Sequence, residues 1–274
     1  PPSITFIIYG MITGESIGDL FLSGIVPGLI FGFMLCIMVF IKSKKNGWKG
    51  ETQRASLKEI GRLFLDTIWG LLSPVIVLGG IYSGLFTPTE AAAVAVVYSL
   101  IVGIFIYKEL RLAELKETLF STAKTTGMIL LIIMNAGIFS WVLTQQGIAA
   151  SLTEMALALT DNKYIMLVII NIVFLCAGCV MDNTSALYIL VPIIMPIAKA
   201  LDINMIQLGV ILVLNLSIGQ VTPPVGPNLY VAADIGKVKF EEICRKMVPL
   251  LLMSLLALLC ITYIPALSLC LIPS

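Results

Sequence analysis

The run QVTPPVG, at residues 220–226, places two adjacent prolines inside an otherwise apolar stretch. Because proline has no backbone N–H, we expect these prolines to leave the carbonyls of Gly219 and Gln220 without their helical donors. Unpaired carbonyls are costly at membrane depth, where irregular backbone is tolerated only if it is buried in protein or lines a cavity. Free carbonyl oxygens and the Thr222 hydroxyl would form an oxygen cage that suits Na⁺. Gly219 and Gly226 allow a close backbone approach at this point.

A second run, MDNTSA, carries side-chain oxygens at four consecutive positions of an apolar segment: Asp182, Asn183, Thr184 and Ser185. An ionisable side chain within a membrane segment indicates a functional site, and we therefore expect cation or substrate binding here. The alternative is helix capping, because aspartate and asparagine are common at helix N-caps. The two roles are compatible for Asp182. Pro192 and Pro196, one turn apart, are expected to shape the helix that follows.

Thr87-Pro88-Thr89-Glu90 matches a capping box, with proline at the first helical position and glutamate at the third. It predicts a helix start after a tight turn, and the small residues that follow favour close helix packing. The EAA triplet also occurs in the coupling loop of ATP-binding cassette permeases. Here it begins a membrane helix on the expected outer side, so that interpretation is set aside.

The composition indicates an integral membrane protein, since 59% of the 274 residues are apolar and 12% are charged, whereas soluble domains are about a quarter charged. The net charge of +1 gives no indication of nucleic-acid binding. The absence of histidine from the sequence excludes Ser–His and Cys–His catalysis and histidine-ligated metals. Cys176 and Cys179 have C-x-x-C spacing, but no thioredoxin-like context surrounds them, and close helix packing is the preferred interpretation.

Apolar runs of about 20 residues predict membrane spans at 20–41, 67–85, 88–107, 125–145 and 247–270. Amphipathic segments at 56–66, 112–123 and 148–160 are expected to lie at the interface. Basic residues within 42–62, 108–124 and 237–246 place these segments on the cytoplasmic side.

The segment 163–200 carries the run MDNTSA near its middle, and each arm is short for a full crossing. A re-entrant helical hairpin is therefore expected. Residues 204–236 are expected to form a helix that is broken at the prolines.

The two proline pairs are related by a constant shift of 222 positions, which aligns Pro1 with Pro223, Pro2 with Pro224, Gly14 with Gly236 and Pro27 with Pro249 without a gap. The turn after the first copy is acidic and the turn after the second is basic, so the pattern recurs with opposite membrane polarity. This is typical of the inverted repeats of secondary transporters.

The repeat and the charge pattern predict four parts of the chain. They are 1–19, the end of a first repeat; 20–124, scaffold spans and interfacial arms; 125–246, a second-repeat transport domain with the hairpin 163–200 and the broken helix 204–236; and 247–274, a final span.

Three segments resemble the large membrane subunit (M, DctM-like) of TRAP transporters: GGIYSGLFTPTEAAAVAVVYSL at 79–100, NLSIGQVTPPVG at 215–226, and the opening PPSITFIIYG with TGESIGDLFLSGIVPGL. The resemblance covers nearly the whole chain and corresponds to the C-terminal part of such a subunit. It implies an all-α integral membrane protein of the elevator type, with inverted repeats, a re-entrant hairpin and discontinuous helices.

The resemblance also implies a function. The chain is expected to be part of a Na⁺-coupled importer, and not an enzyme, in the bacterial inner membrane. The substrate would be a carboxylate-bearing organic acid such as a C4-dicarboxylate or a sialic acid. The implied partners are a small Q membrane subunit, separate or fused, a periplasmic substrate-binding protein and the lipid bilayer.

The residues that the resemblance assigns to Na⁺ are Gly178, Asp182, Asn183, Thr184, Ser185, Gly219, Val221, Thr222 and Pro223. Those expected to meet the substrate are Asp182, Ser185, Thr222, Gly226 and Asn228. A further cation site would use Pro1–Ser3.

Three other functions are weighed against this one. A Na⁺/dicarboxylate symporter that works without a binding protein is the nearest alternative. An intramembrane enzyme would need Glu90 and Asp182 as a carboxylate pair, but the expected topology places them at different depths. A pure assembly subunit gives no reason for two matched helix breaks.

Overall fold

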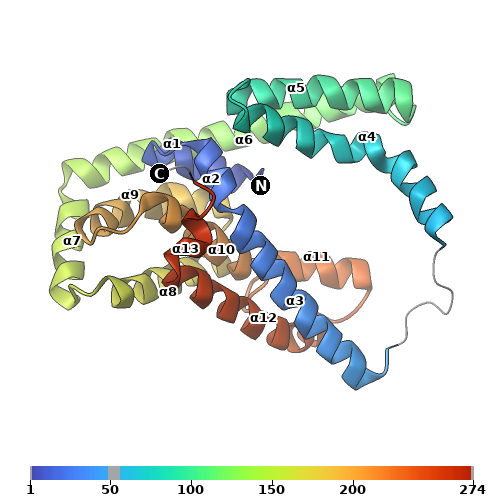
Figure 1. Ribbon diagram of the computed structural model, residues 1–274. Coiled ribbons are helices and arrows are strands. Elements are labelled where there is room, and N and C mark those ends of the chain that lie inside the picture. Colours follow the sequence, from blue (N-terminus) through green and yellow to red (C-terminus); the bar gives the residue numbers. More distant parts are fainter. Residues whose placement is uncertain (1, 49–55, 273–274) are drawn as a thin grey trace. The chain divides into compact units, whose positions relative to one another are not determined.

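The computed structural model describes residues 2–48 and 56–272, and within them the chain forms helices joined by turns, without a strand (Figure 1). In chain order the helices are α1 (Ile4–Thr13), α2 (Ile17–Ser23), α3 (Ile25–Asn46), α4 (Leu57–Tyr82), α5 (Pro88–Ile101), the π-helical η1 (Val102–Ile106), α6 (Leu112–Gln145), α7 (Ile148–Leu159), α8 (Lys163–Val180), α9 (Asn183–Ala200), α10 (Met205–Gly219), α11 (Pro227–Gly236), α12 (Phe240–Tyr263) and α13 (Pro265–Leu269). Pro1, of the first proline pair, and residues 49–55, of the predicted basic loop, lie outside the described residues.

Seven helical segments of the described chain are long and apolar enough to cross a membrane. They are Ile17–Asn46, Leu57–Tyr82, Pro88–Ile106, Glu114–Leu143, Lys163–Val180, Asn183–Ala200 and Phe240–Tyr263. The predicted all-α membrane fold is thereby confirmed.

Two predicted interfacial segments do not form separate helices. The segments at 56–66 and 67–85 join in the single helix α4, and those at 112–123 and 125–145 join in α6. Neither junction contains a glycine or a proline, so no residue ends the helix there. The start of α4 is fixed instead by Ser56, whose side chain accepts a hydrogen bond from the amide of Glu59 (3.2 Å).

The described chain divides into two compact units. The first unit comprises residues 3–47 and 132–272, and the second is the described part of Trp48–Leu131.

The helix α10 is the centre of the first unit, where it packs against α8, α12, α1, α2 and α9 (Figure 1). Its side chains Leu208 and Ile211 are fully buried. The Tyr9 hydroxyl of α1 donates to the Met205 carbonyl at the start of α10 (2.6 Å). Gly209 makes room for the tyrosine ring, because a Cβ there would lie 2.6 Å from a ring carbon of Tyr9. Because α10 is buried on nearly all sides, it is the central helix against which the neighbouring helices of this unit pack.

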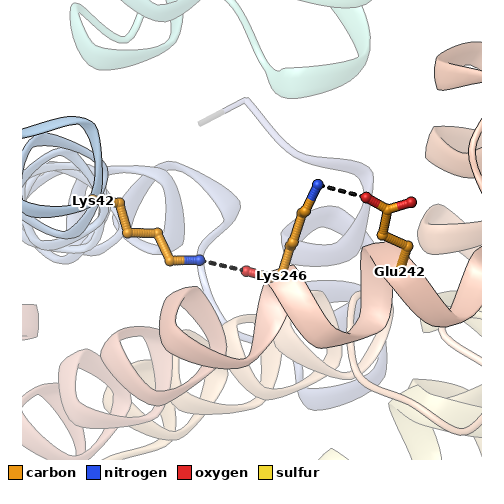
Figure 2. Close-up of polar contacts among 3 residues, drawn as sticks. All are labelled: Lys42, Glu242 and Lys246. Carbon is orange, nitrogen blue, oxygen red and sulfur yellow. Dashed lines mark hydrogen bonds and ion pairs between the residues drawn. The ribbon is translucent and has the colours of Figure 1, made fainter. Parts of the chain in front are cut away.

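In the same unit α3 packs against α12, and a lysine joins the two helices (Figure 2). The Lys42 ammonium of α3 donates to the Lys246 carbonyl of α12 (2.8 Å). The Lys246 ammonium in turn lies 2.6 Å from Glu242, one turn earlier on α12. Both lysines belong to the basic segments whose charge predicts the cytoplasmic side, so this contact joins those two segments.

The helices agree with the internal repeat where the structure describes both copies. The ten-residue α1 shifted by 222 positions covers 226–235, and the ten-residue α11 is Pro227–Gly236. Both end in a left-handed residue, Gly14 (φ 79°) and Lys237 (φ 50°). The aligned prolines Pro27 and Pro249 lie at different places in their helices, at the third residue of α3 and at the tenth residue of α12.

In the second unit α4 and α5 form a helical pair. The predicted capping box is confirmed: the Thr87 hydroxyl accepts from the Glu90 amide (3.3 Å), and the Glu90 carboxylate accepts from the Thr87 amide (2.8 Å). The Tyr98 hydroxyl of α5 donates to the Trp69 carbonyl of α4 (2.6 Å). The role of Glu90 in the structure is therefore to start α5.

Candidate functional site

The turn between α8 and α9 is capped by Asp182. Its carboxylate accepts from the Ser185 amide (3.0 Å) and from the Ser185 hydroxyl (2.7 Å). The predicted capping role is confirmed, and Asp182 remains exposed at the tip. Among the described residues no hydrogen bond joins Asp182 to the 220–226 break.

The break between α10 and α11 corrects the predicted hydrogen bonding. The Gly219 carbonyl accepts from the Thr222 amide (2.9 Å), and the Gln220 carbonyl accepts from the Asn228 amide (3.2 Å). The prediction that these two carbonyls are free is therefore wrong, because the chain turns back on itself at the break and brings in new donors.

The free carbonyls lie a little further along the break. Among the described residues no backbone hydrogen bond reaches the carbonyls of Val221 or Pro223. The Thr222 hydroxyl uses its proton on the Ile218 carbonyl (2.7 Å), which leaves its oxygen able to accept or to coordinate. The Pro223–Pro224 peptide bond is cis. The break thus presents neutral oxygens, of the type that a monovalent cation prefers.

The hairpin tip and the break meet backbone to backbone. A Cβ on Gly219 would lie 2.6 Å from the Cα and carbonyl carbon of Gly178, so only glycine allows this approach of α8 and α10. The Gly226 amide donates to the Cys179 carbonyl (3.3 Å), which ties the end of the break to the end of α8. Gly226 itself has a left-handed conformation (φ 48°) that favours glycine.

A side-chain bond closes the contact. The Gln220 amide of the break donates to the Asn183 side-chain oxygen of the tip (2.9 Å). Gln220 was not among the predicted site residues, although its polar side chain directly at the break was a signal for it.

The structure brings together part of the predicted set. Gly178 and Asn183 of the tip contact Gly219 and Gln220 of the break. The predicted substrate residue Asn228 is exposed, and its backbone amide is already used by Gln220. Thr184 and Ser185 lie half-buried on the first turn of α9.

The predicted ligand set offers neutral oxygens at the break and a single carboxylate, that of Asp182, at the tip. No group of three or more cysteine, aspartate or glutamate side chains that could hold a metal occurs among the described residues. The close approach of Gly178 and Gly219 brings the two backbones into direct contact at the point where two helix ends meet. The oxygens of Val221, Thr222 and Pro223 would be the ones to hold Na⁺ there.

The arm lengths do not by themselves decide whether the pair α8–α9 crosses the membrane. Each helix has 18 residues, about 27 Å, which is close to the thickness of the hydrocarbon core. The predicted shortness of the arms is therefore not what marks a hairpin. The prediction of a re-entrant hairpin rests instead on the contact of the tip with the middle of the α10–α11 segment.

Comparison with known proteins identifies the family. The family described as "Tripartite ATP-independent periplasmic transporter, DctM component" matches residues 1–267. The chain is 42% identical over 271 residues to the C4-dicarboxylate TRAP transporter large permease protein DctM of Pseudomonas aeruginosa. It is 41% identical over 266 residues to the isethionate TRAP transporter permease protein DctMQ of Oleidesulfovibrio alaskensis, and 36% identical over 269 residues to the sialic acid TRAP transporter large permease protein SiaM of Vibrio cholerae.

These alignments cover 99%, 97% and 98% of the chain, respectively. The chain in turn spans 63% of the length of DctM, 42% of DctMQ and 63% of SiaM. All three relatives are permeases, which confirms the prediction that the chain is not an enzyme. Together with the candidate spans of the described residues, the family places the protein in the inner membrane as a multi-pass protein. The chain belongs to the DctM, or large permease, family of TRAP transporters.

Proposed function

We propose that the protein is the large membrane part of a binding-protein-dependent importer that takes up an organic acid anion with Na⁺. The observation that carries the proposal is the joined pair of helix ends, in which the Gly178–Gly219 contact and the Gln220–Asn183 bond hold the neutral oxygens of the break in place. Family membership supports the transport function itself.

The substrate class follows from chemistry that the relatives share. Their names specify a C4-dicarboxylate, a sialic acid and isethionate, which all carry a negatively charged acid group. The first turn of α9 offers backbone N–H groups, which are suitable donors for such a group, while the Ser185 hydroxyl already donates to the Asp182 carboxylate (2.7 Å). A carboxylate-bearing acid is the preferred substrate, and Asp182, Ser185, Thr222, Gly226 and Asn228 are the residues proposed to line its site.

The coupling ion is proposed to bind before the acid. Na⁺ held by the break and by the tip would fix the two against each other and place positive charge beside the acid group. The Na⁺ ligands are proposed to be Gly178, Asp182, Asn183, Thr184, Ser185, Gly219, Val221, Thr222 and Pro223. An elevator movement of this unit would then carry ion and acid together.

The partners are a substrate-binding protein and a small Q permease subunit. The name of the family calls the transporter tripartite and periplasmic. The relative DctMQ carries both letters in one permease protein, which supports a close association of the two membrane parts.

Uptake into proteoliposomes tests this function. The full-length permease and its small subunit are reconstituted, and the uptake of labelled C4-dicarboxylate, sialic acid and isethionate is measured with and without the binding protein. The proposal expects uptake of one acid that needs both an inward Na⁺ gradient and the binding protein. Equal uptake in K⁺ media without any other ion gradient would exclude Na⁺ coupling. Na⁺-driven uptake without the binding protein would favour the alternative, a Na⁺/dicarboxylate symporter.

A further inference from the structure

Buried amide and hydroxyl side chains join three helices beneath the site. The Asn215 amide of α10 donates to the Asn171 side-chain oxygen of α8 (2.6 Å), and the Asn171 amide donates to the Thr262 hydroxyl of α12 (3.2 Å). The Gln207 amide of α10 donates to the Thr262 carbonyl (3.0 Å). Asn215 is 0% exposed, Thr262 1% and Asn171 7%, so the network is shielded from solvent.

Packing helices through buried amide groups costs desolvation free energy. Apolar residues of similar shape would fill the same space without desolvating amide groups. The network also leaves one group unpaired, because the Asn215 side-chain oxygen has no partner although both of its N–H groups donate. Hydrogen bonds are directional, whereas apolar contacts are not. Each bond of the network therefore fixes the position of one helix relative to another.

The Asn171–Asn215 bond lies in the same α8–α10 interface as the Gly178–Gly219 contact of the candidate cation site. Asn215 is one helical turn before Gly219 on α10, and Asn171 is two turns before Gly178 on α8. The residue after Asn215, Leu216, supplies the backbone atoms that a Cβ on Gly178 would meet at 3.0–3.1 Å. A shift of α8 along α10 would therefore alter the network and the Gly178–Gly219 contact together.

We infer that Asn171, Asn215 and Thr262 are positioning residues that fix the register of α8 on α10 and thereby set the geometry of the cation site at the break. This inference rests on the proposed function for its transport consequence. Its structural part, the register of the tip against the break, stands on the bonds and contacts of the network alone.

The test compares three variants in the full-length permease with its small subunit. Thr262→Val removes the hydroxyl that accepts from Asn171, and Thr262→Ser keeps that oxygen. Ser254→Ala is the matched control on the same helix, because Ser254 is also buried (2% exposed) but donates only to the Leu250 carbonyl of its own helix (2.9 Å). We expect Thr262→Val to raise the Na⁺ concentration for half-maximal uptake about fivefold, the equivalent of one hydrogen bond. Thr262→Ser and Ser254→Ala should leave it near the wild-type value.

Hydrogen exchange gives a readout that does not depend on Na⁺ coupling. The backbone amides of 220–228 should exchange faster in Thr262→Val than in Ser254→Ala at equal thermal stability, because the Gly226–Cys179 bond depends on the register. Equal exchange in the two variants would overturn the inference, as would an unchanged Na⁺ requirement in a Na⁺-dependent wild type. A wild type without any Na⁺ dependence would defeat the proposed function instead, and the exchange result would still decide the role of the network.

Discussion

At the scale of single residues, the Thr222 hydroxyl is the clearest proposed cation ligand. It is half-buried at the break and donates its proton to the Ile218 carbonyl. The lone pairs of its oxygen therefore remain available to a cation. Thr222→Val keeps the shape and removes the oxygen. We expect the Na⁺ concentration for half-maximal uptake to rise about tenfold, since a hydrogen bond or ligand at a charged group is worth roughly 1.5–3 kcal/mol.

The control for Thr222 is Ser217→Ala in α10, the helix that precedes the break. Ser217 also donates to the carbonyl four residues earlier, that of Val213 (2.8 Å), but it lies before the break. Na⁺-dependent uptake by Ser217→Ala should match the wild type. A Thr222→Val permease with the wild-type Na⁺ requirement would remove this residue from the cation site.

Asp182 has an observed role as the cap of α9 and a proposed role as a ligand, and substitution can separate the two. Asn is as good an N-cap as Asp, so Asp182→Asn should keep the cap and lose only the charge. We expect uptake to fall at least about tenfold, as for the loss of a charged ligand, while the melting temperature stays near that of the wild type. Asp182→Ala, which also removes the cap, should lower stability by about 1 kcal/mol. Normal uptake by Asp182→Asn would leave the residue as a cap alone.

At the scale of helices, the approach of α8 to α10 depends on Gly219. A methyl group there would lie 2.6 Å from two backbone atoms of Gly178, and backbone cannot move aside as a flexible side chain can. We expect Gly219→Ala to destabilise the protein by about 1–3 kcal/mol, the usual cost of overpacking. Thermal unfolding in detergent measures this.

A second glycine provides the comparison. Gly32, inside α3, has nothing within 4 Å of an added Cβ. Because alanine favours a helix interior over glycine by roughly 0.5–1 kcal/mol, Gly32→Ala should leave stability unchanged or raise it. If both variants melt at the wild-type temperature, α8 and α10 do not approach as closely at Gly219 as the structure has them.

Local sequence signals predicted the helix starts and breaks well. The capping box at Thr87, the Asp182 cap and the two-proline break at 223–224 all follow from residues within a few positions of one another. The predicted boundary between interfacial arm and span near residue 66 failed for a local reason as well, because nothing in the sequence ends a helix there.

Contacts between segments that are distant in the chain could not be predicted from the sequence. The missing proline donors correctly predicted a break, but the new donors to Gly219 and Gln220 come from the way in which the chain turns back. The Asn171–Asn215 bond spans 44 positions, and no helical or strand periodicity marks it. A single sequence shows that these residues are polar in apolar surroundings, and only the fold shows which of them are partners.

At the scale of the whole molecule, the family and the fold class could be predicted because they depend on patterns that run through the chain. The apolar runs, the basic segments and the proline repeat each extend over tens of residues, and the seven candidate spans of the described chain agree with the first of them. The pair α8–α9, predicted to be a re-entrant hairpin, is the element whose depth in the membrane depends on tertiary contacts. Its tip meets the break, and the break lies partway along the α10–α11 segment.

A re-entrant hairpin whose tip meets the break predicts from which side of the membrane each part of the segment 162–237 is accessible to a reagent. In a background without the six native cysteines, Asn162→Cys at the start of α8 should react with a membrane-impermeant maleimide from outside intact cells. Lys237→Cys, in a basic turn, should react only after the membrane is opened. Met181→Cys, in the turn between α8 and α9, should react poorly in both cases if the hairpin is re-entrant, because its neighbours Cys179 and Asn183 are bonded to the break. Labelling of Met181→Cys from the cytoplasmic side as complete as that of Lys237→Cys would make α8 and α9 two full spans. The tip could then not meet the middle of the broken helix, and the proposed cation site would lose the ligands from the tip.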